Sequence, residues 1–266
     1  MLRKHYFIIL LVALNINLLA QENEYNLGLK QYRLKNFTGA IEYFNKAIKI
    51  DTNFTEGYEI RAAAKHLLKD YNGAISDYSK ALILDQKNPN NFASRAYLKN
   101  LLKDYKGAIA DYTNSIMLDS SNESNYFNRG LAYIQLKDYK AATIDMDNAI
   151  KLDENYTDAY LARANIKRTL GDKNAAILDY NNVLKNDDKH FAAYFNRGLL
   201  LALQRNYESA INDFTKAIAL SPNDAKPYYN RGLAKIKIKQ QGCPDVKKAV
   251  QLGYLDAKPL LDQYCK

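Results

Sequence analysis

The sequence after residue 20 repeats at a fixed spacing of 34 residues. Six blocks align in register, and the remaining segment, 225–266, begins like the others before it diverges. A period of this length indicates small supersecondary units, each of which buries its apolar face against its neighbours. We therefore predict one continuous array rather than two domains. The six full blocks are 21–54, 55–88, 89–122, 123–156, 157–190 and 191–224.

Residues of the same size recur at fixed positions of the blocks. The eighth residue is Gly or Ala, the twentieth is Ala in every full block, the twenty-fourth is large, and the fourth is aromatic except at Glu24. The twentieth residues are Ala40, Ala74, Ala108, Ala142, Ala176 and Ala210, and the twenty-fourth are Phe44, Tyr78, Tyr112, Met146, Tyr180 and Phe214.

Each block holds two stretches in which apolar residues recur every three or four positions, as on one face of a helix. In block 191–224 they run from about 192 to 204 and from about 207 to 220, with the short link Arg205-Asn206 between them. A link this short makes the two helices antiparallel neighbours. The small residues let the helix axes approach, and the large residues fill the spaces beside them.

This pattern resembles the tetratricopeptide repeat family, in which an aromatic residue, a Gly, an Ala followed by a Phe, and a Pro recur at set positions. Block 191–224 matches it with Tyr194, Gly198, Ala210, Phe214 and Pro222, and block 123–156 with Tyr126, Gly130, Tyr133, Ala142 and Met146. The resemblance covers 21–224. It implies an all-α fold, a right-handed superhelical solenoid of antiparallel helix hairpins with about six full repeats and a C-terminal cap.

Two charged positions also recur with the period of the blocks. An Arg stands at the seventh position and an Asp at the twenty-third, and in an antiparallel hairpin these positions lie at similar heights. We expect Arg–Asp pairs, within or between hairpins, that fix the register of the helices. A row of arginines that binds a ligand is the alternative. The residues are Arg61, Arg95, Arg129, Arg163, Arg197 and Arg231, with Asp77, Asp111, Asp145, Asp179 and Asp213.

The first twenty residues have a different composition from the blocks. Arg3 and Lys4 precede an apolar stretch from Phe7 to Leu19, and Ala20 is followed by polar residues. This is the pattern of a secretory signal peptide. A membrane anchor is the alternative, but the stretch is shorter than the roughly 20 residues that a spanning helix needs. We expect residues 1–20 to be removed, the chain to be periplasmic or secreted, and no membrane span to remain.

The segment 225–266 departs from the repeat after Gly232. We expect a short helix at about 245–252, a turn at Gly253, and a final helix at about 255–264, which brings Cys243 and Cys265 to the same end of a hairpin. In an oxidising compartment these two cysteines would form a disulfide, and two free thiols are the alternative. The segment also resembles the caps of exported bacterial repeat proteins, and its small residues are spaced as in Sel1-type repeats.

The sequence contains none of the common catalytic or phosphate-binding motifs. His66 and His190 are the histidines after residue 20 and lie far apart in the chain. We therefore predict no catalytic site, no cofactor and no metal. The net charge is +9, but Lys and Arg are spread among Asp and Glu in every block. We interpret this as a solvated surface and predict no nucleic-acid partner; an acidic partner or an anionic membrane face is the alternative.

In the family, several first-helix positions face the inner groove of the superhelix. The resemblance therefore implies a groove that carries aromatic rings and carboxamides, which suit an extended peptide. Packing of these rings between hairpins is the alternative. The Lys–Asn pair with which some family members hold a partner's terminal carboxylate is absent from every block. The candidate groove residues are Tyr25, Tyr97, Phe127, Asn128, Asn165, Phe195, Asn196, Tyr229 and Asn230.

Three functional hypotheses follow from the sequence. The first is a non-catalytic scaffold of the cell envelope that binds a peptide or a partner protein in the groove. The second is a structural subunit of an envelope or outer-membrane assembly that uses its convex face or the ends of the stack. The third is a regulatory subunit of an envelope enzyme complex.

Overall fold

The computed structural model describes residues 2–265, with side chains from residue 17 onward, and within this range it contains helices and no strand. The all-α fold predicted from the repeats is confirmed. The chain divides into two compact units, Met1–Ala142 and Thr143–Lys266. The boundary falls inside one helix, Tyr139–Leu152, rather than at a linker. We call the two parts unit 1 and unit 2 and describe each by itself.

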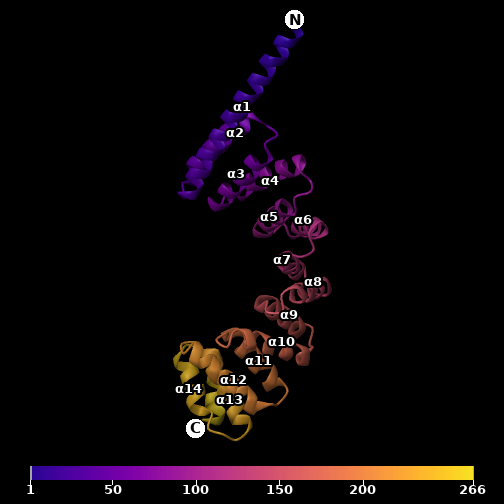
Figure 1. The fold of residues 1–266 in the computed structure, drawn as a ribbon. Coiled ribbons are helices and arrows are strands. Elements are labelled where there is room, and N and C mark those ends of the chain that lie inside the picture. Colours follow the sequence, from indigo (N-terminus) through magenta and orange to yellow (C-terminus); the bar gives the residue numbers. More distant parts are fainter. Residues whose placement is uncertain (1, 266) are drawn as a thin grey trace. The chain divides into compact units, whose positions relative to one another are not determined.

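Unit 1 is a series of helix hairpins in which consecutive helices pack against each other (Figure 1). Its first hairpin joins α1 to α2, its second joins α3 to α4, and its third joins α5 to α6. The helices are α1 (Leu2–Arg33), α2 (Phe37–Ile50), α3 (Thr55–Leu67), α4 (Tyr71–Leu84), α5 (Pro89–Leu101), α6 (Tyr105–Leu118), α7 (Glu123–Gln135) and the start of α8 (Tyr139–Leu152).

Unit 2 continues the same arrangement and ends in a smaller helical cap. The hairpins α9–α10 and α11–α12 are followed by α13, which packs against both α12 and α14. The elements are α9 (Thr157–Thr169), α10 (Lys173–Asn186), α11 (Phe191–Leu203), α12 (Tyr207–Leu220), α13 (Ala225–Lys237), α14 (Cys243–Gln251), the 3₁₀ turn η1 (Leu255–Ala257) and α15 (Lys258–Tyr264).

The turn within each hairpin has the same chemistry from block to block. The fifteenth residue adopts a left-handed backbone, with φ between 59° and 64° at Lys35, Lys69, Lys103, Lys137, Arg205 and Lys239, and φ 86° at Gly171. In the six full blocks the sixteenth residue is Asn or Asp, and its side chain accepts a hydrogen bond from the backbone N–H three residues later, as between Asp104 and Gly107 at 3.0 Å. This caps the second helix of the hairpin. The left-handed residue therefore ends the first helix, and the capping residue starts the second.

The turn between hairpins is built around an Asp at the thirty-first position. Its side chain accepts a hydrogen bond from the backbone N–H two residues later, as from Lys87 to Asp85 at 2.8 Å. Such local bonds stabilise a tight turn. The same bond recurs at Asp51, Asp119, Asp153 and Asp187. Short turns of fixed geometry explain why the period stays at 34 residues.

The core of each hairpin is the seam predicted from the small and large positions. The twentieth-position alanines are fully buried, as are the Phe44, Met146, Tyr180 and Phe214 side chains one turn later on the same helices. At Gly198 an added Cβ would lie 2.8 Å from Cε1 of Phe214, which leaves no room for it without a shift of the ring.

The expected signal peptide lies largely outside the described side chains, because these begin at residue 17. The backbone helix α1 runs from Leu2 to Arg33 and passes the expected cleavage point after Ala20 without a break. Among the described residues, no helix combines the length and the apolar character needed to cross a membrane.

The cap has the expected helices, but their boundaries differ from those expected. Helix α14 begins at Cys243, two residues earlier than predicted, because Pro244 stands in its first turn, where the missing N–H of a proline costs no helical hydrogen bond. The final helix begins at Lys258 rather than Leu255, and the 3₁₀ turn η1 precedes it. Val246, Ala249 and Ala257 form the buried centre of the cap, on which Tyr229 and Tyr254 pack.

Candidate binding surfaces

The charged ladder is made of bidentate ion pairs inside the hairpins. In each described pair, two guanidinium nitrogens of the Arg donate to the two carboxylate oxygens of the Asp, with the shorter distances at 2.6–2.7 Å. The pairs are Arg61–Asp77, Arg95–Asp111, Arg163–Asp179, Arg197–Asp213 and, in the cap, Arg231–Asp245. The carboxylates of these pairs are buried. Arg129 and Asp145 stand at the same block positions.

Each ladder Arg also contacts the preceding hairpin. Its remaining terminal nitrogen donates to the twenty-fifth residue of the block before, as from Arg95 to Ser79 at 3.0 Å and from Arg129 to Thr113 at 3.0 Å. Its guanidinium group lies 5.3–5.8 Å from the centre of the fourth-position ring. The guanidinium N–H groups of each Arg thus donate to partners within the protein. The geometry therefore favours the structural interpretation over a row of ligand-binding arginines.

Sequence reasoning missed a third member of the ladder. Lys65, Lys99, Lys167 and Lys235 each pair with the ladder Asp at 2.7–2.8 Å. They stand four residues after the ladder Arg, so the signal was present in the sequence as an i, i+4 spacing. Block 191–224 has Leu201 at this position. Among the described residues, Asp213 is therefore paired with one cation, Arg197, instead of two.

A hollow of about 240 Å³ opens on the first-helix face of unit 1. Its rim carries Tyr97, His66 and Asn128, and its floor carries Tyr78 and Tyr112 from the second helices. Burial raises the pKa of Tyr78 and of Tyr112 above that of a free phenol, so both hydroxyls stay protonated at neutral pH. The hollow therefore combines aromatic surface with neutral hydrogen-bonding groups.

A second hollow, of about 460 Å³, opens on the first-helix face of unit 2. Leu199 and Leu203 of α11 and Leu233 of α13 give it an apolar lining. Three cations, Arg168, Lys173 and Lys237, stand among the residues around it. It is larger and more apolar than the hollow of unit 1, whose lining includes no Lys or Arg.

The predicted groove residues divide into packed and accessible side chains. Tyr25 stacks edge-on against Phe54 with ring centres 5.0 Å apart, Phe195 contacts Phe191 and Phe214 at 6.0–6.1 Å, and Tyr229 contacts Tyr254 at 5.1 Å. These three rings therefore contribute to the packing between helices. Phe127 and Asn196 are half-buried on α7 and α11.

Tyr97 is the exposed ring of the predicted set, at 42% exposure, and it lies 5.6 Å from the ring of His66. The carboxamides divide in the same way. Asn165 accepts a hydrogen bond from the Tyr180 hydroxyl at 2.7 Å, whereas Asn128 lines the hollow of unit 1 and Asn230 that of unit 2. The structure thus gathers part of the predicted set into two separate hollows.

A third hollow lies on the second-helix side of unit 1, and sequence reasoning did not predict it. Its volume is about 550 Å³, and its lining includes Ile83, Met117 and Leu118. Ile83 and Met117 are 69% and 79% exposed, an unusual environment for large apolar side chains. Both stand at the twenty-ninth position of adjacent blocks, where other blocks carry Lys49, Lys151 and Lys185. That contrast was visible in the sequence.

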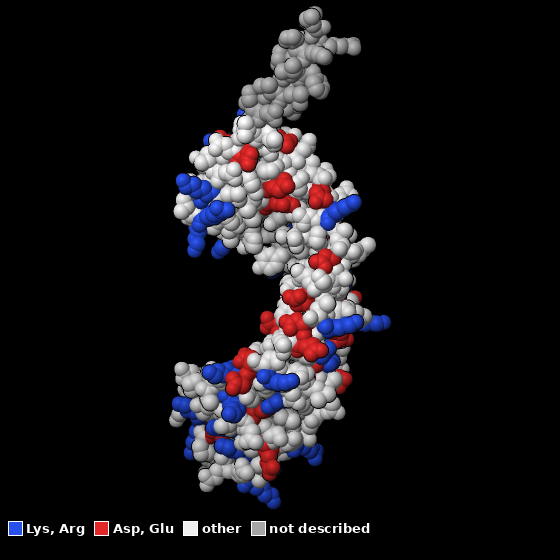
Figure 2. Space-filling model, viewed as in Figure 1, with Lys and Arg blue, Asp and Glu red and all other residues white. Residues whose placement is uncertain are grey.

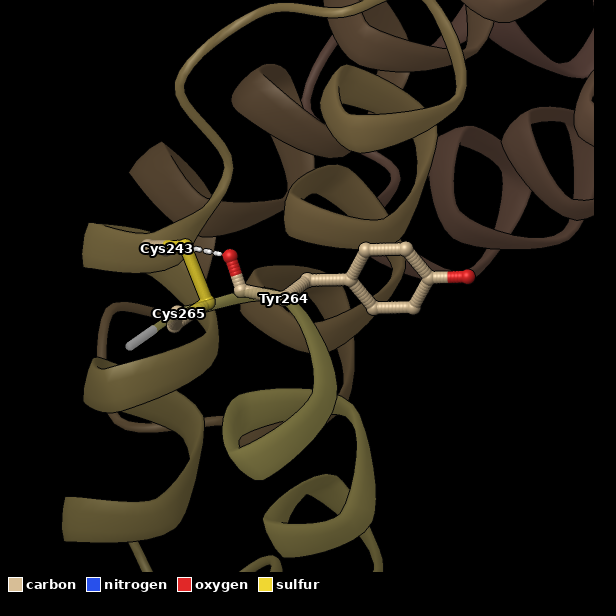
Figure 3. Close-up of a disulfide and its surroundings, with 3 residues drawn as sticks. All are labelled: Cys243, Tyr264 and Cys265. Carbon is tan, nitrogen blue, oxygen red and sulfur yellow. Dashed lines mark hydrogen bonds between the residues drawn. A yellow bond between two sulfur atoms is a disulfide. The ribbon is translucent and has the colours of Figure 1, made fainter.

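A disulfide joins Cys243, at the start of α14, to Cys265, just after α15 (Figure 3). The two α-carbons are 5.4 Å apart, and Sγ of Cys243 lies 3.4 Å from the carbonyl oxygen of Tyr264, whose ring points away from the sulfur atoms. The bond closes the last turn of the cap. Asp245 in the same helix has a lowered pKa, because burial, which raises it, is outweighed by hydrogen bonds from Arg231 and Lys235.

Charges of both signs appear on each unit over the face drawn in Figure 2. The described residues include no group of three or more His, Cys, Asp or Glu side chains that could hold a metal ion.

Four segments of the chain match sequence models of the tetratricopeptide repeat, at 22–54, 124–156, 157–190 and 191–224. Together they cover half of the chain, and their limits fall within two residues of the blocks read from the sequence. Among curated proteins, none matches the chain.

Several solved structures share the fold. A tetratricopeptide repeat protein from Parabacteroides merdae is 22% identical over 91% of this chain and 98% of its own, with a TM-score of 0.65. PilF from Pseudomonas aeruginosa is 18% identical over 77% of this chain and 94% of its own, with a TM-score of 0.63. YrrB, described as having an unusual peptide-binding site, is 24% identical over 67% and 92%, with a TM-score of 0.60. At these identities the similarity shows the fold alone.

Proposed function

Because this chain belongs to the tetratricopeptide repeat family, we propose that it is a non-catalytic protein–protein interaction scaffold of the cell envelope, and that it binds a peptide or a partner protein along its first helices. One observation carries this proposal. Two separate hollows, one in each unit, lie on the face formed by the first helices, and each has an exposed side chain in its lining, Tyr97 in unit 1 and Leu203 in unit 2.

The residues around the hollows suit a peptide. Tyr97 offers an exposed ring, and Asn128 offers a carboxamide that can donate to and accept from an extended backbone. Leu203 offers an exposed apolar side chain in unit 2. A few aromatic or apolar anchors with adaptable polar neighbours are the usual composition of a protein-binding surface.

Residues 1–20 and the cap support an exported location. A charged start, an apolar stretch and a small residue at position 20 form a recognisable export signal. The disulfide between Cys243 and Cys265 is a type of bond that persists in oxidising compartments. N-terminal sequencing of the protein from an envelope fraction tests this part of the proposal. Sequencing should begin at Gln21, and recovery of the intact chain from the cytosol with two free thiols would contradict export.

Site-specific photocrosslinking in the native cell tests the binding face and captures whichever partner occupies it. A photoreactive amino acid is placed at Tyr97 or Leu203 on the first-helix face, and at Met117 on the opposite side of unit 1. We expect one adduct of defined mass from the first two positions and none from Met117. The adduct should decrease when Asn128→Ala is combined with the probe at Tyr97.

The third hollow favours a second candidate function. Ile83 and Met117 together present apolar surface that an array of this kind does not need for its own packing. If the protein is a structural or regulatory subunit of an envelope assembly, this side would contact the assembly. Adducts from Met117 but not from Tyr97 or Leu203 would favour that function over the first.

A further inference from the structure

We propose that the hollow of unit 2 selects peptide segments in which apolar side chains are flanked by carboxylates. This inference rests on the proposed function and names the class of partner for one of its two hollows. The occupant we commit to is a short acidic and apolar segment of a partner protein. The argument rests on the shape, the exposed apolar surface and the charges of this hollow.

The apolar part of the hollow is open to solvent. Leu203 stands at the end of α11 and is 65% exposed, which is high for a leucine beside other apolar residues. Leu199 lies one turn earlier on the same helix, and Leu233 lies at the corresponding block position on α13. Each apolar side chain that covers this surface would gain about 25 cal/mol for every Å² of apolar area removed from water.

The cations around the hollow come from three different helices. Arg168 lies near the end of α9, Lys173 is the first residue of α10, and Lys237 is the last residue of α13. No ion pair joins any of the three to a carboxylate of the described residues. Arg168 does approach the hydroxyl of Tyr180, which is a neutral partner. The lining of the hollow includes no Asp or Glu.

Two of these cations stand at positions where the repeat does not require a charge. The seventeenth residue of the other full blocks is aromatic, namely Phe37, Tyr71, Tyr105, Tyr139 and Tyr207, and Lys173 replaces this ring. Lys237 stands at the thirteenth position, which varies from block to block: Arg33, Leu67, Leu101, Gln135, Thr169 and Leu203. The architecture of the hairpins therefore does not require these charges. They give one hollow a positive rim that the hollow of unit 1 lacks.

The sequence that follows the last full block also has a positive net charge. Residues 225–266 contain nine Lys or Arg and three Asp or Glu. Of these cations, Arg231 and Lys235 are used by Asp245, and Lys237 is not. A positive rim around an apolar centre favours anionic partners and penalises cationic ones, since like charges that approach each other raise the free energy of binding.

A peptide selection tests the inference. The full chain is used to select from a surface-displayed library of random octapeptides with amidated or masked C-termini, which removes the terminal carboxylate as a source of charge. We expect the enriched peptides to combine Leu, Ile or Phe with two or more Asp or Glu. We also expect their binding to weaken at least tenfold with Lys173→Gln combined with Lys237→Gln, and with Leu203→Glu.

A matched control removes the same net charge from a place outside the hollow. Lys185 and Lys216 are exposed on the second helices α10 and α12 of the same unit and do not line the hollow. The variant Lys185→Gln with Lys216→Gln loses the same net charge and should bind the selected peptides as the native chain does. Circular dichroism of all variants checks that each keeps its helices.

The outcomes separate the inference from the proposed function. Enriched peptides without acidic residues, or acidic peptides that bind equally to the Lys173 and Lys185 variants, would overturn the inference and leave peptide binding intact. Failure of the native chain to enrich any peptide, together with absence of photocrosslinks at Tyr97 and Leu203, would overturn the proposed function itself.

Discussion

Removal of Arg197 should destabilise its hairpin more than removal of Arg163 destabilises its own, because the two changes leave different carboxylates behind. Arg163→Ala leaves Asp179 in contact with Lys167, whose Nζ lies 2.8 Å away. Arg197→Ala leaves Asp213, a residue only 4% exposed, without a cation among its described neighbours. The position that Lys167 occupies in its block is Leu201 in the block of Arg197.

The expected magnitudes differ accordingly. A buried charge that loses its partner costs about 3–5 kcal/mol of unfolding free energy. A buried carboxylate that loses hydrogen bonds from one cation but stays paired with a second cation, as Asp179 does with Lys167, costs about 1.5–3 kcal/mol. Arg163 also contacts the exposed Asp147, but an exposed ion pair adds at most about 1 kcal/mol. We therefore expect Arg197→Ala to cost about 2 kcal/mol more than Arg163→Ala.

A second substitution tests the cause. Adding Leu201→Lys to Arg197→Ala restores a cation at the position from which Lys167 reaches Asp179, and it should recover part of the lost stability. Because hairpins of an array can open separately, amide hydrogen exchange in α12 is measured alongside urea unfolding followed by circular dichroism. Leu201→Lys alone is the control. Equal losses for the two Arg variants, or no recovery in the double variant, would refute the reasoning.

Three further predictions concern the turns and the cap. Lys103→Gly should raise stability by about 0.5–1 kcal/mol, because φ at Lys103 is 64° and a left-handed backbone is costly for a residue with a Cβ; a lower urea midpoint would contradict this. Burial raises the pKa of Asp245, but the hydrogen bonds from Arg231 and Lys235 lower it by more, so the folded pKa lies below that of an unfolded Asp. The stability that Asp245 contributes is therefore present above the unfolded pKa and is lost as pH falls through the folded pKa. Protection factors for hydrogen exchange in α14, which correct for the intrinsic pH dependence of exchange, should therefore fall in acid, and Asp245→Asn should flatten that dependence; an unchanged profile would argue against it. Cys243→Ser should destabilise the cap by about 3 kcal/mol, measured as faster exchange in α15 with little change in α9; equal exchange in α15 before and after the change would disprove it.

The sequence by itself determined the hairpins. A repeat places residues in the same local environment many times. A residue type that recurs at one block position therefore reflects a structural requirement of the hairpin rather than chance. The invariant Ala at the twentieth position, the large residue four later and the polar turns together predicted helix limits close to those observed, such as Tyr207–Leu220. The small departures, at Cys243 and Lys258, occur in the cap, where the period ends and no second copy of the pattern is available for comparison.

Only the tertiary structure decided which surface residues are free to bind. Tyr25 and Tyr97 are both aromatic residues at predicted groove positions, yet Tyr25 packs on Phe54 and Tyr97 is exposed. A hollow is the volume that remains after side chains from several hairpins have packed, so Lys173, Leu203 and Lys237 line one hollow although they belong to three successive blocks of the sequence. The period of the sequence describes one hairpin at a time, whereas accessibility is a property of the stack.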